Sequence, residues 1–337
     1  MRSAHPDDGR LATAYAGRRA LVLGGLGFVG AHVTRALVGA GARTTVVGRE
    51  LRRHADQVGS LRAAGIQVEE ADVADSDAMR RVIRDQEVVF HLCGRPGAVR
   101  SVDAPLADLR TNLEGTVSLL EAMRAVAPGA KLVFAGSRLA YGVPRALPID
   151  EEHPMEPRCP HGIHQAAVDR YLAIYGELHG IRSARLRITN VYGPGQVQGR
   201  NSYGILNYFV QEAVAGRRIV LYGDGAILRD YVFIDDVRRA LLLAGAVAES
   251  DGLAMNVGGG EGRSMLDAAR LIVRLAGAGG IEYAEWPAAA RVVETGSFVA
   301  NVDRIQRVLG WSASVAFEDG LRRTIDGYRG GAVAPGA

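Results

Sequence analysis

Hydrophobic positions along the first part of the chain alternate between two patterns. Short runs of consecutive apolar residues, such as Ala20–Leu23, are typical of strands that are buried on both faces of a parallel sheet. Between these runs, apolar residues recur at helical spacing. The pattern therefore predicts strands at 19–23, 43–47, 66–70, 87–92, 131–135 and 183–189, with helices at 28–40, about 50–64, 76–84, about 106–126 and about 162–179. Such alternation predicts an α/β fold with a doubly wound parallel sheet.

The pattern changes after Gly193, where loops and short apolar runs replace the regular alternation. Helical spacing recurs only in separated segments, at about 204–215, 235–247, 264–276, 302–308 and 317–328. A chain of 337 residues is long enough for one large α/β domain and a smaller lobe. We therefore expect a smaller C-terminal lobe, with part of the C-terminal chain returning to pack against the sheet.

Three glycines at a spacing of three, Gly24, Gly27 and Gly30, join the first predicted strand to the first helix. Free backbone N–H groups and the helix dipole converge at such a helix start and make it an anion site. In this arrangement Gly24 permits the turn, Gly27 lets a pyrophosphate approach, and Gly30 lets the helix pack close to the strand. With Phe28 and Val29 at the helix start, these residues predict a dinucleotide site on a Rossmann-type fold.

This cofactor site and the change of pattern together predict the domain organisation. The large domain would bind NAD(P), and the smaller lobe would bind the substrate. We expect a flexible extension at 1–17, the NAD(P)-binding domain at 18–192 with about 232–258 returning to it, the substrate lobe at 193–231 and 259–328, and a flexible tail at 329–337.

Ligands of such sheets lie outside the carboxyl ends of the strands, so residues that follow strands are candidates for cofactor contacts. Gly48 and Arg49 stand where an acidic residue would bind the ribose 2′-hydroxyl of NAD. They leave room and charge for a 2′-phosphate, which favours NADP over NAD, unless Arg49 belongs to a solvated face of arginines. After the third strand, Asp72 and Val73 are candidates for adenine contacts, and Asp72 is equally compatible with a helix N-cap.

The fourth and fifth predicted strands also end in candidate site residues. Leu92, Cys93 and Gly94 follow the fourth strand, where a pyrophosphate would pass. His91 ends an apolar run and is interpreted as a packed histidine rather than a catalyst. Ser137 follows the fifth strand and brings a hydroxyl group to the cleft.

Composition and charge exclude several other classes of protein. A net charge of +3 without a basic stripe argues against nucleic acid as a partner. Only Cys93 and Cys159 are present, which excludes a disulfide framework and fits a reducing compartment. Residues 1–16 lack the apolar core of a signal peptide, and no apolar run is long enough to span a membrane. We expect a cytoplasmic protein without a membrane partner or a metal ion.

Several segments, in order along about residues 18–328, resemble the extended short-chain dehydrogenase/reductase family of nucleotide-sugar epimerases and dehydratases. They are Leu23–Gly30, Val89–Gly94, Asn112–Thr116, Asn190–Pro194, Leu221–Gly225, Arg229–Val237 and Leu309–Trp311. In this resemblance Ser137 falls on the catalytic serine/threonine. The helices at about 106–126 and 162–179 fall where the family builds a four-helix interface, which implies a homodimer.

The resemblance also implies how the smaller lobe would hold a nucleotide-diphosphate sugar. Arg229 and Arg291 would bind phosphates, which suits the planar fork of arginine, although either is also compatible with a surface ion pair. Tyr222 would border the nucleotide base. Asn190 would donate a hydrogen bond to the diphosphate.

The sequence departs from the family at its catalytic helix, where the family carries Tyr-x-x-x-Lys. His161 stands at the tyrosine position and Gln165 at the lysine position, and Lys131 is the only lysine of the chain. Because histidine titrates near pKa 6.5 and tyrosine near 10, His161 could act as acid/base without a neighbouring cation, while Gln165 bonds the cofactor ribose. The alternatives are a non-redox lyase, epimerase or rearrangement enzyme that uses His161 or His164 as a base, and a catalytically silent binder of dinucleotide or nucleotide sugar.

The residues after Ser137 narrow the reaction further. The family's dehydratases and decarboxylases carry acidic residues there, whereas this chain has Arg138 and Leu139. Arg138 is a candidate for contact with an acidic substituent of the substrate, or it faces solvent. We therefore expect an NAD(P)-dependent nucleotide-sugar epimerase that works by transient oxidation, with Ser137, His161 and Gln165 as its catalytic residues.

Overall fold

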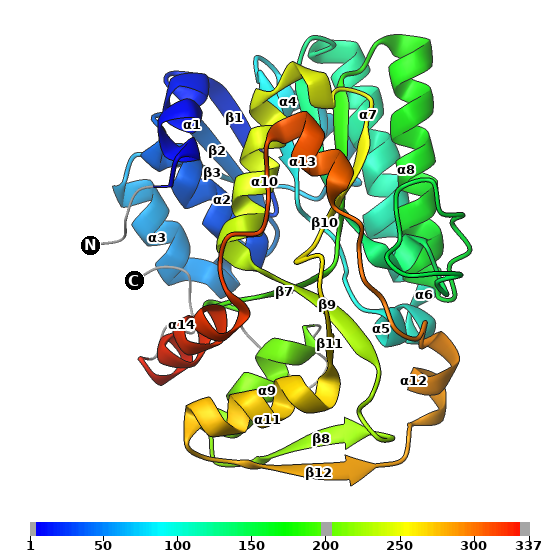
Figure 1. The fold of residues 1–337 in the computed structure, drawn as a ribbon. Coiled ribbons are helices and arrows are strands. Elements are labelled where there is room, and N and C mark those ends of the chain that lie inside the picture. Colours follow the sequence, from blue (N-terminus) through cyan, green and yellow to red (C-terminus); the bar gives the residue numbers. More distant parts are fainter. Residues whose placement is uncertain (1–4, 197–203, 331–337) are drawn as a thin grey trace.

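The computed structural model describes residues 5–196 and 204–330, and its centre is a seven-stranded parallel sheet (Figure 1). The strands lie in the order β10-β6-β5-β4-β1-β2-β3, and every neighbouring pair is parallel. They are β1 (Arg19–Leu23), β2 (Arg43–Gly48), β3 (Gln67–Glu70), β4 (Val88–His91), β5 (Lys131–Ser137), β6 (Ser183–Ile188) and β10 (Ala254–Val257). The predicted α/β fold with a doubly wound sheet is confirmed.

Helices cover both faces of this sheet, which explains the consecutive apolar residues of central strands such as β1 and β4. Along β1, Ala20 and Val22 join the core under α2 and α10, while Leu21 and Leu23 join the core under α4, α7 and α8. These helices are α2 (Phe28–Gly39), α10 (Ile234–Ala246), α4 (Ser76–Ile83), α7 (Gly115–Val126) and α8 (Pro160–His179). At the β2–β3 edge the covering elements are η1 (Leu51–His54) and α3 (Ala55–Ala63).

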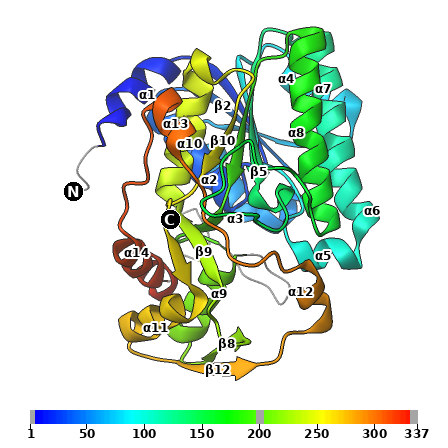
Figure 2. The same cartoon turned by 45° about the vertical axis from the view of Figure 1, so that its right-hand side comes forward.

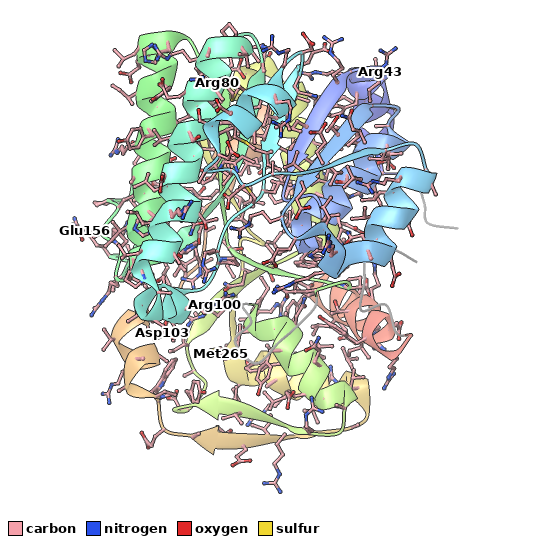
Figure 3. All side chains as sticks on the ribbon, turned by 180° about the vertical axis from the view of Figure 1, so that it is seen from behind. Arg43, Arg80, Arg100, Asp103, Glu156 and Met265 are labelled. Atoms are coloured by element: carbon pink, nitrogen blue, oxygen red, sulfur yellow. The ribbon has the colours of Figure 1, made fainter. Side chains whose placement is uncertain are left out.

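The carboxyl ends of the strands face the smaller lobe. Figure 3 places Arg43, the first residue of β2, at the end of the sheet farthest from the lobe that contains Met265. The lobe packs a three-stranded and a two-stranded sheet against helices. Its elements are β7 (Asn190–Tyr192), α9 (Ile205–Val214), β8 (Arg218–Tyr222), β9 (Leu228–Phe233), β11 (Gly262–Ser264), α11 (Met265–Ala276), β12 (Gly280–Ala284), α12 (Ala288–Val293) and α14 (Phe317–Arg329).

The predicted long helix at about 106–126 is interrupted. It consists of α6 (Pro105–Asp108), a π-helical turn η2 (Leu109–Glu114) and then α7. A π turn widens the helix by one residue and often occurs at functional sites. Here it places Asn112 near the start of α8, where the side-chain amide of Asn112 contacts His161. The remaining elements are α5 (Ala98–Asp103), η3 (Arg138–Ala140), η4 (Ala248–Ser250) and α13 (Asp303–Leu309).

Two boundaries differ from the predicted domain organisation. The prediction of a flexible extension at 1–17 is wrong for α1 (Asp7–Tyr15), a helix whose Leu11 and Tyr15 are buried against the large domain. The hydroxyl group of Tyr15 donates to the carbonyl oxygen of Leu242 on α10, at 2.6 Å. Two apolar residues one helical turn apart are enough to anchor α1, but they are too few to stand out as a periodic pattern.

The second difference concerns α13, which was predicted to belong to the substrate lobe. Ile305, Leu309 and Trp311 instead join the core of the large domain beneath α10, and Figure 1 shows α13 beside β10 and α10. The chain therefore returns to the large domain a second time before α14. The predicted tail at 329–337 lies outside the described residues beyond Gly330. Within the described ranges, no helix has the length and apolar character needed to cross a membrane.

Because Tyr15 anchors α1, replacing it tests whether this helix is part of the fold. We expect Tyr15→Ala to lower the free energy of unfolding by about 3 kcal/mol or more, since a buried ring and its hydrogen bond are lost. Thr13→Ala, an exposed position on the same helix, should change it by less than about 0.5 kcal/mol. Urea denaturation of the two variants provides the measurement, and equal midpoints would show that α1 does not support the fold.

Candidate active site

The turn between β1 and α2 forms a tight backbone cradle. Gly24 has φ +82, and a Cβ atom there would lie 2.7 Å from the backbone nitrogen of Cys93. A Cβ atom on Gly30 would lie 2.1 Å from the carbonyl oxygen of Gly24, so only glycine fits. No side chain caps the N-terminus of α2, whose first N–H groups at Phe28 and Val29 have no partner within the helix. These donors fit the pyrophosphate of a dinucleotide cofactor.

Arg49 and Asp72 meet at the carboxyl edge of β2 and β3. Arg49 Nη1 lies 3.3 Å from Asp72 Oδ2, and Asp72 Oδ1 accepts from the backbone N–H of Ala74. Burial raises the pKa of Asp72, but the bonds from Ala74 and Arg49 outweigh it and hold the pKa below its usual value. The N-cap of α4 is Asp75 rather than Asp72, so the N-cap alternative for Asp72 is wrong.

The loop after β4 is fixed by Asn112. Its side-chain oxygen accepts from the N–H of Arg95 at 2.9 Å, and its amide nitrogen donates to the carbonyl oxygen of Arg95 at 3.2 Å. A Cβ atom on Gly94 would lie 2.8 Å from the Asn112 side-chain oxygen, so glycine permits this approach. Within the same loop Leu92 and Cys93 are half-buried.

Burial raises the pKa of the Cys93 thiol to about 12, which favours its protonated form at neutral pH. Its sulfur lies 3.4 Å from Nδ1 of His91. That histidine is fully buried, and its Nε2 lies 2.8 Å from Thr116 Oγ1. Burial lowers the pKa of His91 to about 4, which agrees with its interpretation as a packed histidine. Val73, on the next loop, is buried against α7.

His161 lies in the first turn of α8 and is only 6% exposed. The turn is fixed by Cys159, whose sulfur accepts from the N–H of Gly162 at 3.3 Å. His161 Nδ1 lies 3.3 Å from the amide nitrogen of Asn112 and 3.4 Å from Asp108 Oδ2. Nδ1 can therefore donate to Asp108 or accept from Asn112, so the ring keeps one orientation whether or not its Nε2 carries a proton.

Asp108 is shared by two histidines. Its Oδ1 lies 2.6 Å from Nδ1 of His164, one helical turn beyond His161. Burial raises the pKa of Asp108, but hydrogen bonds from His161, His164 and Asn112 together outweigh it and hold the pKa below its usual value. An ionised carboxylate can therefore orient His161 and stabilise its cationic form. Asp108 was not among the predicted site residues, because a continuous helix at about 106–126 does not indicate that Asp108 lies opposite α8.

Ser137 and Gln165 border one small cavity of about 10 Å³ behind the end of β5. Ser137 Oγ accepts from the N–H of Leu139 at 3.2 Å, which leaves the hydroxyl proton available to donate. Gln165 is buried, and within the described part of the chain its Oε1 has no hydrogen-bond partner. The cavity has room for about one water molecule, so it does not itself hold a cofactor group.

On the substrate side, the predicted phosphate ligands contact protein groups. Arg229 Nη2 donates to both carboxylate oxygens of Glu294, at 2.8 and 2.7 Å, and the Asn190 amide donates to the carbonyl oxygen of Asp230 at 2.9 Å. Arg291 lies exposed on α12.

The partners of two of the predicted substrate residues, Arg229 and Tyr222, could not be predicted from the sequence. Besides Glu294, these include Trp286, whose ring centroid lies 5.4 Å from that of Tyr222. The remaining predicted residue, Arg138, donates from Nη1 to Thr295 Oγ1 at 3.2 Å. Across residues 5–196 and 204–330, no group of three or more His, Cys, Asp or Glu side chains is placed to hold a metal ion.

Comparisons with known proteins agree with this arrangement. A family model described as the NAD dependent epimerase/dehydratase family matches residues 20–258. UDP-glucose 4-epimerase of Mycolicibacterium smegmatis is 33% identical over 322 residues, which span 92% of this chain and 98% of that protein.

Two solved structures have the same fold over nearly their whole length. UDP-glucose 4-epimerase of Thermus thermophilus in complex with NAD has a TM-score of 0.80 at 30% identity, covering 93% of this chain and 99% of that chain. UDP-glucose 4-epimerase of Thermotoga maritima with UDP-glucose has a TM-score of 0.82 at 28% identity, with the same coverage. The chain therefore belongs to the NAD-dependent epimerase/dehydratase family.

Proposed function

We propose that this protein is a nucleotide-sugar epimerase in which His161 replaces the family's tyrosine as acid/base. The observation that carries the proposal is the fixed orientation of His161 Nδ1 between Asp108 and Asn112. Free histidine titrates near pKa 6.5, so this residue type can exchange protons at neutral pH without the lysine that activates the family's tyrosine. Replacement of the family's tyrosine by His161 and of its lysine by Gln165 is therefore chemically consistent with retained activity.

The proposed mechanism assigns one task to each residue of the site. A nicotinamide dinucleotide held at the Gly24–Gly30 turn would supply hydride acceptance and return. His161 Nε2 takes the proton of the sugar hydroxyl and later gives it back, while Asp108 stabilises the cationic ring in between. The Ser137 hydroxyl donates to the same sugar oxygen. Gln165 hydrogen-bonds the cofactor ribose in place of the lysine.

The substrate lobe supports a nucleotide diphosphate as the substrate handle. The paired rings of Tyr222 and Trp286 provide an aromatic surface that suits a nucleotide base. The Arg229 guanidinium is held in one position, because Nη2 donates to both oxygens of Glu294 and Nη1 donates to the carbonyl oxygen of Gly296. A phosphate would exchange with that carboxylate, while Asn190 and the exposed Arg291 add further donors to the diphosphate.

His161→Ala tests the assignment of the acid/base. We expect kcat for UDP-glucose, or for the best sugar of a nucleotide-sugar panel, to fall by about 10²- to 10⁴-fold, because the proton acceptor is lost. His179→Ala, at an exposed position on the same helix, should keep kcat within about twofold. Full turnover by His161→Ala would contradict the assignment, and binding without turnover by the wild type would favour the silent-binder alternative.

We propose NADP rather than NAD as the cofactor. Arg49 is half-exposed and needs to exchange only a surface pair with Asp72 to reach a 2′-phosphate, and such pairs are weak. No acidic side chain occupies the end of β2, where Gly48 lies.

Titrations with both dinucleotides test this preference. Arg49→Ala should raise the Kd for NADP about tenfold, the value of one charge-assisted contact, and leave the Kd for NAD unchanged. Arg53→Ala removes a more exposed arginine nearby and serves as the matched control. Tighter binding of NAD than of NADP by the wild-type protein would reject the proposal.

We also propose that the protein forms a homodimer through α8 and the helices beside it. Exposed apolar side chains line α5, α6, η2 and α8, which lie together along one side of the molecule in Figure 2. They are Val99, Val102, Leu106, Leu109, Ile163, Tyr171, Ile174 and Leu178. On α8 these positions recur at helical spacing, so they form one face. Such a cluster of exposed apolar side chains on neighbouring helices indicates an interface with another protein chain.

Sedimentation velocity tests the dimer. Leu178 is 67% exposed, and Leu178→Glu would bury a charge at the interface. The wild-type chain should sediment as a dimer and the variant as a monomer with unchanged circular dichroism. Val292→Glu, at a comparably exposed apolar residue on α12, should stay dimeric. A monomeric wild-type protein would overturn the proposal.

A further inference from the structure

The small cavity behind the end of β5 is lined by polar residues of α8 and β6. Its volume of about 10 Å³ gives room for about one water molecule. Four polar atoms of its lining residues are buried and have no hydrogen-bond partner among residues 5–196 and 204–330. They are Gln165 Oε1, Asp169 Oδ1, Arg185 Nε and Arg187 Nε. Buried polar groups nearly always have a partner, so four such atoms around one cavity indicate a site for a polar molecule.

The spacing of these four residues along the chain brings them together. Gln165 and Asp169 are four positions apart on α8, so they share one face of the helix. Arg185 and Arg187 are two positions apart on β6, so they lie on one face of the sheet. The exposed fractions of Gln165, Asp169 and Arg187 are 7%, 4% and 7%. A polar cluster therefore lies between helix and sheet, in a layer that is otherwise an apolar core.

The charged members of the cluster are held in place by other contacts. Arg187 Nη2 donates to Asp169 Oδ2, and its Nη1 donates to the hydroxyl group of Tyr141 at 2.9 Å. Arg185 donates from Nη1 to the carbonyl oxygen of Asp169 at 2.9 Å and from Nη2 to that of Gly252 at 2.6 Å. Arg185 Nε lies 3.5 Å from Asp169 Oδ1, which is longer than a good hydrogen bond. Neither guanidinium can therefore turn its Nε toward another partner without losing these bonds.

We propose that the cavity binds one water molecule, which donates to Gln165 Oε1 and Asp169 Oδ1 and accepts from the Nε–H groups of Arg185 and Arg187. Two acceptors and two donors match the hydrogen-bonding capacity of water. An anion would be repelled by the Asp169 carboxylate and a cation by the two guanidinium groups. A neutral molecule fits this balance of charge, and the volume admits nothing larger than water.

The bound water fixes the orientation of the Gln165 amide. Its oxygen faces the water, so its nitrogen faces away from the cavity. A flipped amide would place its own N–H donors beside those of the two guanidinium groups. The family carries lysine at this position, which can only donate, and an outward nitrogen lets Gln165 donate as well. Asp169 is thus a positioning residue that acts on Gln165 through the water. This consequence rests on the proposed cofactor contact of Gln165, whereas the water site itself does not.

Neutron diffraction from a crystal of the full chain exchanged into D₂O tests the site directly. Deuterium scatters strongly, so the map shows a bound water and distinguishes the amide nitrogen from the oxygen. We expect one D₂O molecule in the cavity and the two deuterium atoms of the Gln165 amide on the side away from it. A cavity without a water molecule, or amide deuterium atoms directed into it, would overturn the inference.

A double-mutant cycle tests the action of Asp169 through Gln165, with Kd for NADP and for NAD measured by calorimetry. Gln165→Met keeps the side-chain length without the amide and should raise the Kd of the dinucleotide that binds more tightly about fivefold. Asp169→Asn should raise it about threefold, because the water is held less well. In the Gln165→Met background Asp169→Asn should change it by less than about 1.5-fold, since no amide is left to orient.

Tyr141→Phe is the matched control, because it removes a different hydrogen bond of Arg187 and should leave the Kd within about 1.5-fold of the wild type. If Asp169→Asn does not fold, Arg185→Lys replaces it in the cycle, since it keeps the charge and loses the Nε–H group.

The outcomes separate this inference from the proposed function. An equal loss of affinity in both backgrounds would mean that Asp169 supports only the fold, which overturns its positioning role. A bound water with an unchanged Kd for Gln165→Met would support the water site and overturn the cofactor contact of Gln165. A wild-type protein that turns over no nucleotide sugar would overturn the epimerase, while the neutron map would still decide on the water.

Discussion

All seven strands of the large sheet run parallel, so their carboxyl ends open on one edge, and the candidate cofactor-binding and catalytic residues depend on this constraint. Burial of both faces under helices leaves that edge as the place where polar groups can gather. The glycine turn after β1 and the loops after β4 and β5 meet there. The start of α8 adds His161 and Gln165 from the next connection. The lobe built on β9 then faces this edge and brings Arg229 toward it.

Within this frame, Asp108 decides what His161 can do. A buried histidine without a charged partner would favour its neutral form, as His91 does. His161 instead lies beside a carboxylate that hydrogen bonds keep ionised, so a cationic ring is tolerated when a proton arrives. Asp108 contacts Nδ1 of the His161 ring, which leaves Nε2 as the nitrogen that can exchange a proton with a ligand. The replacement of Tyr-x-x-x-Lys by His161 and Gln165 is thus accompanied by Asp108, a carboxylate from another segment of the chain that contacts the His161 ring.

The fold could be predicted from local pattern because buried parallel strands and the turn at Gly24 are encoded by neighbouring residues. What could not be predicted depends on contacts between distant segments. Tyr15 is held by a carbonyl group 227 positions away, and Arg229 by a carboxylate 65 positions away. Likewise Asp108 contacts His164 across 56 positions. Asp108 directly precedes a π turn, and no periodic pattern in the sequence predicts that turn. Candidate residues were therefore predictable one by one, and their partners were not.

The central claim is that the substrate is oxidised and reduced again at one carbon, with His161 exchanging only the hydroxyl proton. Turnover in D₂O, followed by mass spectrometry and NMR of the product, tests this most directly. We expect inversion of the sugar centre without solvent deuterium on carbon, because the carbon-bound hydrogen leaves and returns as hydride. Deuterium incorporated at that carbon would contradict it, since His161 would then be removing a proton from carbon in a non-redox reaction.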